Sequence, residues 1–411
     1  MRLLPASWRN PHLARLLAAT GISEFGTEIS NLAMPLTAIT VLHASIFEVA
    51  ALTACMFLPT AAFGLFAGAW VDRARKRPLM IASDVVRAAS LASIPLAWAL
   101  GALTLVQLYA VTLIVATLNI LFEVAKQSYV PAVVVRDQLG TANSQLQLAE
   151  QGAAVAGPGI GGILVGWIGA PWAIAVDAIS YLGSAGLIAN VAHVETPATA
   201  QPKGRIFASI KEGIRFVIGH EYLRPLALGG ATVGFFARML SAILLVYLAR
   251  EARLGASTIG LVLSVAGAGF VLGAVFASAV VRAVGLGRSA TAGLLGAAAG
   301  LLVIGVAPPH LAAWSASAGM FIYGASAVLW QVGSTTLRQF VTPSDLLGRV
   351  TATMRVISTF PIPVAAIVGG IVGEIIGARP TLIVAGVGAA IAAVSILATK
   401  VPRFKELPLA A

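Results

Sequence analysis

Residues 111–126 read VTLIVATLNILFEVAK, a nearly continuous apolar run whose two charges, Glu123 and Lys126, come near its end. Runs of this kind recur from one end of the 411-residue chain to the other. A helix needs about 20 apolar residues to cross a bilayer, whereas strands of a membrane β-barrel alternate apolar and polar residues in segments of about ten. The chain is 58% hydrophobic and 10% charged, against about 25% charged in a soluble domain. It is therefore predicted to be an all-α membrane protein.

Twelve transmembrane helices are predicted from these runs. They lie at residues 14–41, 46–71, 78–100, 104–127, 142–168, 171–192, 225–249, 256–281, 288–307, 310–337, 346–376 and 380–399. The first run continues past the length of a signal peptide, so we expect it to remain as the first span.

A long polar interruption at residues 193–224 divides the chain into a six-helix half at 1–192 and a second half at 225–411. Within this linker, IFASIKEGIRFVIGH (206–220) sets apolar residues opposite charged ones. That pattern predicts an amphipathic helix lying on the inner membrane surface.

Lysine and arginine fall mostly on one side of the predicted topology. A net charge of +11 would suggest nucleic acid as the partner of a soluble protein. Here, however, the basic residues sit in short loops, and the side opposite the termini holds only Arg250, Arg253 and Arg379. The positive-inside rule therefore places both termini in the cytoplasm of a multi-pass inner-membrane protein, with the lipid bilayer and no nucleic acid as its partner. The single cysteine, Cys55, excludes an intrachain disulfide.

The two halves resemble each other at one offset of 208 residues (345 − 137). That offset maps Asp137-Gln-Leu-Gly140 onto Asp345-Leu-Leu-Gly348, Gly161-Gly162 onto Gly369-Gly370, and Gly169-Ala170 onto Gly377-Ala378. Two pseudo-symmetric halves of six helices suit alternating access around a central site near the membrane midplane.

The loop GAWVDRARKRPLM (68–80) resembles the signature that the major facilitator superfamily carries between its second and third spans. The matching positions are Gly68, Asp72, Arg73, Lys76 and Arg77, whereas Arg75 stands where the family usually has Gly. We expect Gly68 to allow close helix packing, and Asp72 to form charge-assisted contacts that break when the halves rock. A plain positive-inside loop is the alternative interpretation.

The stretch AVAGPGIGGILVG (154–166) resembles the antiporter motif of the drug–proton exchangers in that superfamily. Its core is Gly157-Pro158-x-x-Gly161-Gly162, and Ser144 and Ala153 replace earlier glycines of the full motif. The pattern favours a kinked helix with a smooth face, with ordinary small-residue packing as the alternative. Residues 139–182 and DLLGRVTATMRV (345–356) are similar to the branch that includes the enterobactin exporter and macrolide efflux proteins.

This resemblance implies the major facilitator fold and a secondary active exporter that exchanges protons for a drug, siderophore or other small natural product. We expect a monomer without cofactor or metal. An importer or uniporter of the same fold is the nearest alternative. A primary pump is disfavoured because the chain has no G-x-x-x-x-G-K-[ST] loop. An enzyme is disfavoured because the five histidines lie at span ends or in loops, and a non-transporting receptor stays open.

Polar residues inside spans are costly and usually face a cavity or a partner. Glu24 and Glu28 lie four residues apart on the first span, and Asn31 continues the same stripe. One of these glutamates is the predicted proton carrier, because a buried carboxylate can hold a proton near neutral pH. A carboxylate hydrogen-bonded between helices is the alternative. Arg238, mid-depth in the seventh span, either joins an ion pair or attracts an anionic substrate.

Further polar and aromatic residues are candidates for the substrate cavity. They are Asn31, Asn119, Gln147, Glu150, Gln151, Arg238, Tyr323, Trp330 and Gln331. Glu123 and Asp177 are also expected to face the interior of the helix bundle. We expect Glu123 to pair with Lys126, and Asp84 to pair with Arg87 or with the loop signature. Tyr323 and Trp330 share a face of the tenth span, where they either stack on a flat substrate or take part in ordinary aromatic packing. The fourth span lacks the arginine that many drug–proton antiporters use in proton coupling.

Overall fold

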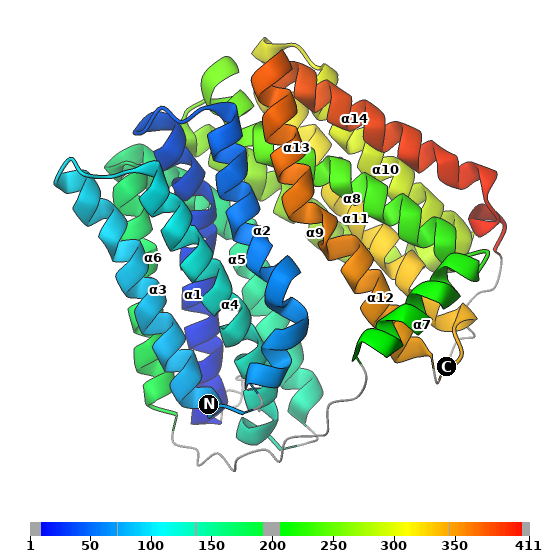
Figure 1. Cartoon of the computed structure of the whole chain (residues 1–411), viewed down its shortest axis with the longest axis horizontal. Coiled ribbons are helices and arrows are strands. Elements are labelled where there is room, and N and C mark those ends of the chain that lie inside the picture. Colours follow the sequence, from blue (N-terminus) through cyan, green and yellow to red (C-terminus); the bar gives the residue numbers. More distant parts are fainter. Residues whose placement is uncertain (1–9, 72, 136–137, 192–205, 345, 405–411) are drawn as a thin grey trace. The chain divides into compact units, whose positions relative to one another are not determined.

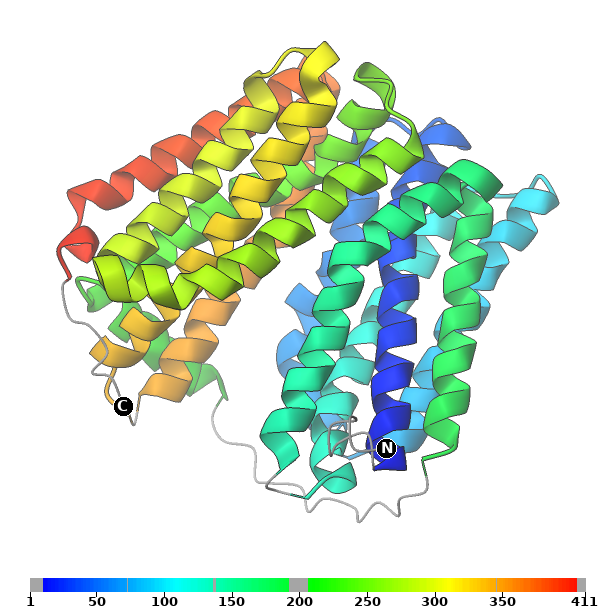
Figure 2. The same ribbon diagram turned by 180° about the vertical axis from the view of Figure 1, so that it is seen from behind.

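The computed structural model describes residues 10–71, 73–135, 138–191, 206–344 and 346–404, and these residues fold into helices (Figures 1 and 2). The helices are α1 (Pro11–Thr40), α2 (Ile46–Val71), α3 (Lys76–Ala99), α4 (Leu105–Val133), α5 (Leu139–Ile168), α6 (Ala170–Ala189), α7 (Ile206–Gly219), α8 (Leu223–Val246), α9 (Ala256–Val284), α10 (Leu286–Val306), α11 (Ala312–Val341), α12 (Leu347–Thr359), α13 (Pro361–Ile376) and α14 (Ala378–Ser395). A π-helical turn, Tyr247–Glu251, extends α8, and 3-10 turns lie at Pro309–Leu311, Ile396–Ala398 and Val401–Arg403.

Eleven helical segments among the described residues are long and apolar enough to cross a membrane. The twelfth span is α1, which has 30 residues and therefore ample length. Glu24, Glu28 and Asn31, together with several hydroxyl side chains, lower the hydropathy of this helix. The chain is thus an all-α membrane protein with twelve spans, as the sequence predicts.

The predicted eleventh span, residues 346–376, is broken into α12 and α13. The break falls at Phe360, directly before Pro361, which is the first residue of α13. Proline has no backbone N–H and its ring crowds the preceding turn, so the helix cannot continue unchanged through this position. The two helices together still form one membrane-crossing segment.

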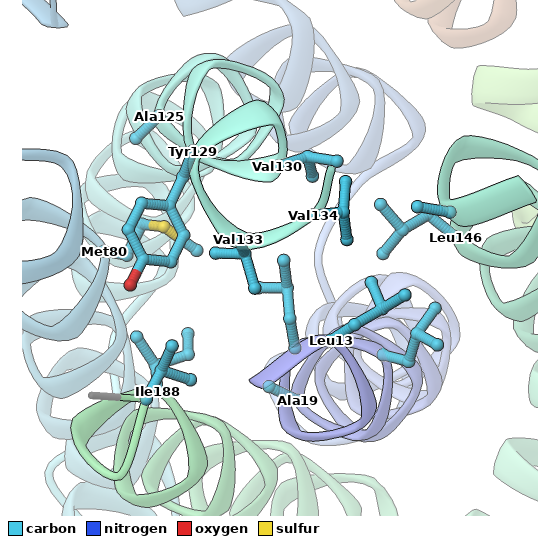
Figure 3. Close-up of a cluster of buried hydrophobic side chains, with 14 of the residues drawn as sticks. Leu13, Ala19, Met80, Ala125, Tyr129, Val130, Val133, Val134, Leu146 and Ile188 are labelled. Atoms are coloured by element: carbon cyan, nitrogen blue, oxygen red, sulfur yellow. The ribbon is translucent and has the colours of Figure 1, made fainter. Parts of the chain in front are cut away.

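The chain divides into two compact units. The first holds α1, α2 from Cys55 onward, α3 to α6, and the start of α9. In it, α1 packs against α5 and α6, and α3 packs against α4 and α6; Figure 2 shows the first three alongside one another. Side chains from α1, α3, α4, α5 and α6 converge in one core, in which Leu13, Met80, Tyr129 and Leu146 are buried (Figure 3).

The second unit holds α7, α8, most of α9, α10 to α14, and the start of α2. Here α10 packs against α11 and α14, and α8 packs against α13 and α14. The predicted amphipathic helix is α7, which packs against α12. Gly213 and Val217 of α7 are buried, Glu212 pairs with Arg349 of α12 at 2.8 Å, and Ile214 is exposed. The side chains of residues 206–211, which complete the predicted apolar face, lie outside the described part.

The internal repeat is visible in the turns between helices. Gly169, between α5 and α6, has φ of 85°, and Gly377, between α13 and α14, has φ of 89°. Only glycine adopts this backbone region readily. The two turns are related by the repeat offset, so the glycines that define the repeat in sequence also make the same turn.

The repeat also governs close helix packing. A Cβ on Gly162 of α5 would lie 2.9 Å from the Cα of Gly260, at the start of α9 in the same unit. In the second unit, a Cβ on Gly370 of α13 would lie 2.6 Å from the Cβ of Ala50, at the start of α2. Each half therefore uses an equivalent glycine to bring one helix against the start of another.

Each unit further carries an apolar groove at an equivalent position. The first, of about 650 Å³, lies among α1, α5 and α6 and has Gly21 and Ser180 on its wall. The second, of about 420 Å³, lies between α8 and α14 and has Gly229 and Gly388 on its wall. Gly21 and Gly229 are separated by the repeat offset of 208 residues, and so are Ser180 and Gly388. The two grooves therefore lie at positions that the sequence repeat relates.

Candidate functional site

The polar stripe on α1 is half-buried inside the first unit. Glu24 and Glu28 lie one helical turn apart, and the Asn31 side chain lies beside Glu28. Glu28 packs against α5, because a Cβ on Gly157 would lie only 2.5 Å from the Cβ of Glu28. The structure therefore brings a predicted proton carrier directly against the glycine of the antiporter-like motif.

A second charged group joins α4 to α5. Lys126, with only 3% of its side chain exposed, lies 2.6 Å from Glu123 and 2.8 Å from Glu150. Gln147 donates to the other oxygen of Glu150 at 2.9 Å. We name these four residues the lysine cluster. Glu24 of α1 is within electrostatic reach of its three charged members.

The lysine cluster has more acidic than basic groups around it. One lysine faces Glu123, Glu150 and Glu24, so the group carries excess negative charge when all three carboxylates are ionised. Gln151, the next residue on α5, is exposed beside it. Such a group attracts protons or a cationic ligand.

A third polar group centres on the buried residues Asp84 and Arg87. Arg87 of α3 pairs with Asp84 one turn earlier, and its guanidinium donates to the Asn119 side chain of α4 at 2.6 Å. The same guanidinium lies over two aromatic rings, 4.1 Å from the centre of Tyr181 and 4.6 Å from that of Phe122. Asn119, a predicted cavity residue, therefore accepts a hydrogen bond from Arg87 within the first unit.

Helix α6 adds another acid to this region. Asp177 accepts a hydrogen bond from Ser180 at 3.0 Å, and both fill the space left by Gly26 of α1, where a Cβ would lie 2.3 Å from the Asp177 carboxylate. The Tyr181 hydroxyl is 2.8 Å from the hydroxyl of Thr27 on α1. The polar side chains of α6 therefore contact α1 through a glycine and a threonine.

The Gly-Pro motif of α5 forms a smooth face. Gly157, Pro158, Gly161 and Gly162 are all buried. A Cβ on Gly161 would lie 3.2 Å from the Cα of Ile29 on α1. Gly157 and Gly161, one turn apart on α5, thus allow its backbone to approach the helix that carries the glutamates, as small residues do in membrane helix packing.

Two basic residues of the loop signature form hydrogen bonds near the ends of helices. Lys76 donates at 2.9 Å to the carbonyl of Val71, the last residue of α2, and to that of Ala74 in the following turn. Arg77 donates to the carbonyls of Ile188 and Ala189 at the end of α6. Cations at this end of a helix interact favourably with its dipole. Arg73 is exposed, and Asp72 lies outside the described residues.

The close packing expected at Gly68 is absent from the described residues, since a Cβ there would meet no atom within 4 Å. Near this end of α2, Ala67 and Val71 are buried instead. Close approach occurs instead at the glycines of α5.

The aromatic candidates of the second unit are packed inside it. Tyr323 stands at right angles to Phe270 of α9, with ring centres 6.3 Å apart. The Trp330 ring covers Gly230 of α8, where a Cβ would lie 2.8 Å from it. The remaining candidates are exposed, namely Arg238 on α8 and Gln331 on α11. Among the described residues, no group of three His, Cys, Asp or Glu side chains could hold a metal ion.

Sequence reasoning missed Gly26, Thr27, Ser180 and Tyr181. Ser180 and Tyr181 lie three and four residues after Asp177, the spacing that puts side chains on one helix face. That signal could have drawn attention to them. Nothing in the sequence indicates that they meet α1.

Comparison with known proteins places the whole chain in one family. The model of the transmembrane secretion effector family matches residues 5–411. The uncharacterised MFS-type transporter YvqJ of Bacillus subtilis is 25% identical over 354 residues, covering 85% of this chain and 83% of that protein. The multidrug efflux pump Tap of Mycolicibacterium fortuitum is 27% identical over 371 residues, covering 86% of this chain and 87% of that protein.

Solved structures share the fold at low sequence identity. A variant of the nucleoside transporter NupG superposes with a TM-score of 0.79 at 9% identity, covering 94% of this chain and 99% of that one. A bacterial homologue of the iron transporter ferroportin, in its inward-facing state, gives 0.75 at 15% identity, covering 96% and 99%. The chain is therefore a multi-pass membrane transporter of the major facilitator superfamily and belongs to its transmembrane secretion effector family.

Proposed function

We propose that this transporter exports a drug, siderophore or other small natural product across the cytoplasmic membrane in exchange for protons. The observation that carries the proposal is the contact of Glu28 with Gly157, where the polar stripe of α1 meets the Gly-Pro face of α5. Ionisable residues at membrane depth mark ion and substrate pathways. The likeness to the multidrug efflux pump Tap supports export as the direction.

The exchange is carried by carboxylates that bind either a proton or a basic group of the substrate. Glu24 is the better placed to alternate between the two, because it shares its surroundings with Lys126, Glu123 and Glu150. When Glu24 is protonated, one negative charge fewer faces the lysine. When the proton leaves, the group regains its affinity for a cationic cargo. Glu28 acts at the helix contact, where its charge affects how tightly α1 and α5 pack.

The orientation proposed for this cycle puts both termini and α7 in the cytoplasm. It rests on the excess of lysine and arginine in the loops on that side. The transporter works as a monomer in this scheme, since each step uses residues of a single chain. Protons enter from outside as cargo leaves.

The test begins with drug-susceptibility profiling of a deletion strain, which identifies a compound that the cell tolerates less well without the transporter. That compound is then the probe in everted membrane vesicles energised by respiration. We expect its uptake into the vesicles to stop when nigericin abolishes the pH gradient. Replacing Glu24 or Glu28 by Gln should abolish gradient-driven uptake, whereas Glu221→Gln, on an exposed side chain of the second unit, should leave it unchanged.

The alternatives give different results in the same assay. Uptake that persists after a protonophore abolishes both the pH gradient and the membrane potential would rule out proton antiport. Entry of the compound into intact cells, rather than into everted vesicles, would indicate an importer. Specific binding of the compound without any flux would indicate a receptor.

A further inference from the structure

Three ionisable side chains in the first unit are sealed from solvent. Asp84 and Arg87 on α3 are 0% and 1% exposed, and Asp177 on α6 is 1% exposed. The guanidinium pairs with Asp84, and Asp177 is within electrostatic reach of both. We name these three residues the arginine cluster.

The arginine cluster has two acids and one base. Among the described residues, the groups that face it from neighbouring helices add no compensating cation. Helix α6 contributes the neutral Tyr181, α4 contributes Asn119, and α1 contributes Thr27 and Ser30. Glu24 of α1 faces Tyr181 and is itself acidic. On α5, the charged residue Glu150 pairs with Lys126 instead. With both aspartates ionised, a net negative charge would remain in a site that excludes water.

An uncompensated charge is strongly disfavoured in such surroundings, and a buried group then neutralises instead. The two aspartates also hold unused bonding capacity. One oxygen of each, Oδ2 of Asp84 and Oδ2 of Asp177, is buried without a hydrogen-bond partner. Ser184 and Ser30 lie beside them, but their hydroxyls are outside hydrogen-bond geometry. A buried carboxylate oxygen that accepts no hydrogen bond can carry a proton instead.

We propose that the arginine cluster binds one proton, shared between Asp84 and Asp177, as a proton site distinct from Glu24 and Glu28. The shared proton brings the cluster to neutrality with Arg87. Its ligand is a proton rather than a metal cation, because the guanidinium already occupies the space between the acids' helices and repels a second fixed cation. The inference depends neither on the direction of transport nor on the coupling ion.

The cluster is also connected to α1. Arg87 lies over the ring of Tyr181, whose hydroxyl bonds Thr27, between Glu24 and Glu28 in the sequence. Gly26, on the same turn, leaves room for Asp177 and Ser180. Binding or release of the proton would therefore alter the contacts that α6 makes with α1, the helix that carries the polar stripe.

Infrared spectroscopy of the purified full-length protein in lipid nanodiscs tests the proposal. The signal is the carbonyl stretch of a protonated carboxylic acid at neutral pH. We expect the Glu24→Gln/Glu28→Gln variant to retain one such band. In that background, Asp177→Asn should abolish it, and so should Asp84→Asn, because either change leaves one acid for one guanidinium and removes the need for a proton.

The pattern of loss separates a shared proton from other arrangements. Absence of any band in the Glu24→Gln/Glu28→Gln variant, measured without touching the aspartates, would overturn the proposal. Persistence of the band in Asp84→Asn would also overturn it, since Asp177 would then be protonated regardless of the charge balance with Arg87. A difference titration supplies the second readout, in which Asp177→Asn should release one proton fewer than its parent as the pH is raised.

Discussion

Replacing Lys126 by Met tests whether the lysine cluster holds α4 and α5 together. The ammonium group lies 2.6 Å from Glu123 and 2.8 Å from Glu150, with 3% of the lysine side chain exposed. Removing one partner of a buried ion pair costs about 3–5 kcal/mol, because the other charge is left uncompensated. The two carboxylates are 33% and 23% exposed, so water relieves part of that penalty. We therefore expect a loss near the lower end, about 3 kcal/mol.

The matched control is Lys400→Met. Lys400 also bonds a glutamate, Glu221, at 2.6 Å, but these side chains are 65% and 51% exposed. Exposed pairs contribute little because solvent screens them, so this variant should unfold like the wild type. Adding Glu150→Gln to Lys126→Met removes one uncompensated charge and should restore about 1 kcal/mol.

The assay is unfolding by sodium dodecyl sulfate in mixed micelles, followed by tryptophan fluorescence. A free energy for Lys126→Met within about 1 kcal/mol of the wild type would refute the reasoning. Equal destabilisation by both lysine variants would refute it as well, since burial would then have no influence.

Three further predictions concern helix packing, a histidine and a helix end. Gly162→Ala should destabilise the protein by about 1–3 kcal/mol, because the added Cβ overlaps the backbone of α9. The control is Gly152→Ala on the same helix, where a Cβ meets nothing within 4 Å, so this variant should keep the wild-type stability. Thermal unfolding of the two variants measures the difference. Burial lowers the pKa of His220 and the neighbouring Glu221 raises it, so Glu221→Gln should lower this pKa further in an NMR titration. Because the folded pKa of His220 is depressed, its contribution to stability is present above about pH 6.5 and is lost as the pH falls through the folded value. Arg77→Gln removes hydrogen bonds to the end of α6 and should cost about 1–2 kcal/mol, visible as faster hydrogen exchange there.

The fold was largely predictable because hydrophobic length and sequence repetition are local signals. Twelve apolar runs required only that each be long enough to cross a bilayer. The pairing of Gly169 with Gly377 needed only a constant offset, and both residues adopt the positive φ that glycine permits. The break before Pro361 was missed because hydropathy does not register a lost backbone donor.

The polar contacts divide by how far apart their partners lie in the chain. Glu123 and Lys126 are three residues apart, so helix geometry alone predicts that they meet. Arg87 meets Asn119 and Tyr181, 32 and 94 residues away (119 − 87 and 181 − 87), only because α3, α4 and α6 pack together. No periodicity within one helix carries that information. Gly26 shows the same limit, since its role depends on Asp177 of another helix.

The two charged groups of the first unit differ in how a proton can reach them. In the lysine cluster, the carboxylates keep 33% and 23% of their surface exposed, so protons and a basic cargo can compete for the negative charge beside Glu24. In the arginine cluster, Asp84 and Asp177 are sealed, so no cargo can enter and only a proton fits. In the proposed scheme, exchange with a substrate is therefore assigned to the lysine cluster and Glu24. A proton held by the arginine cluster can influence that exchange through the Tyr181–Thr27 contact with α1, without meeting the substrate.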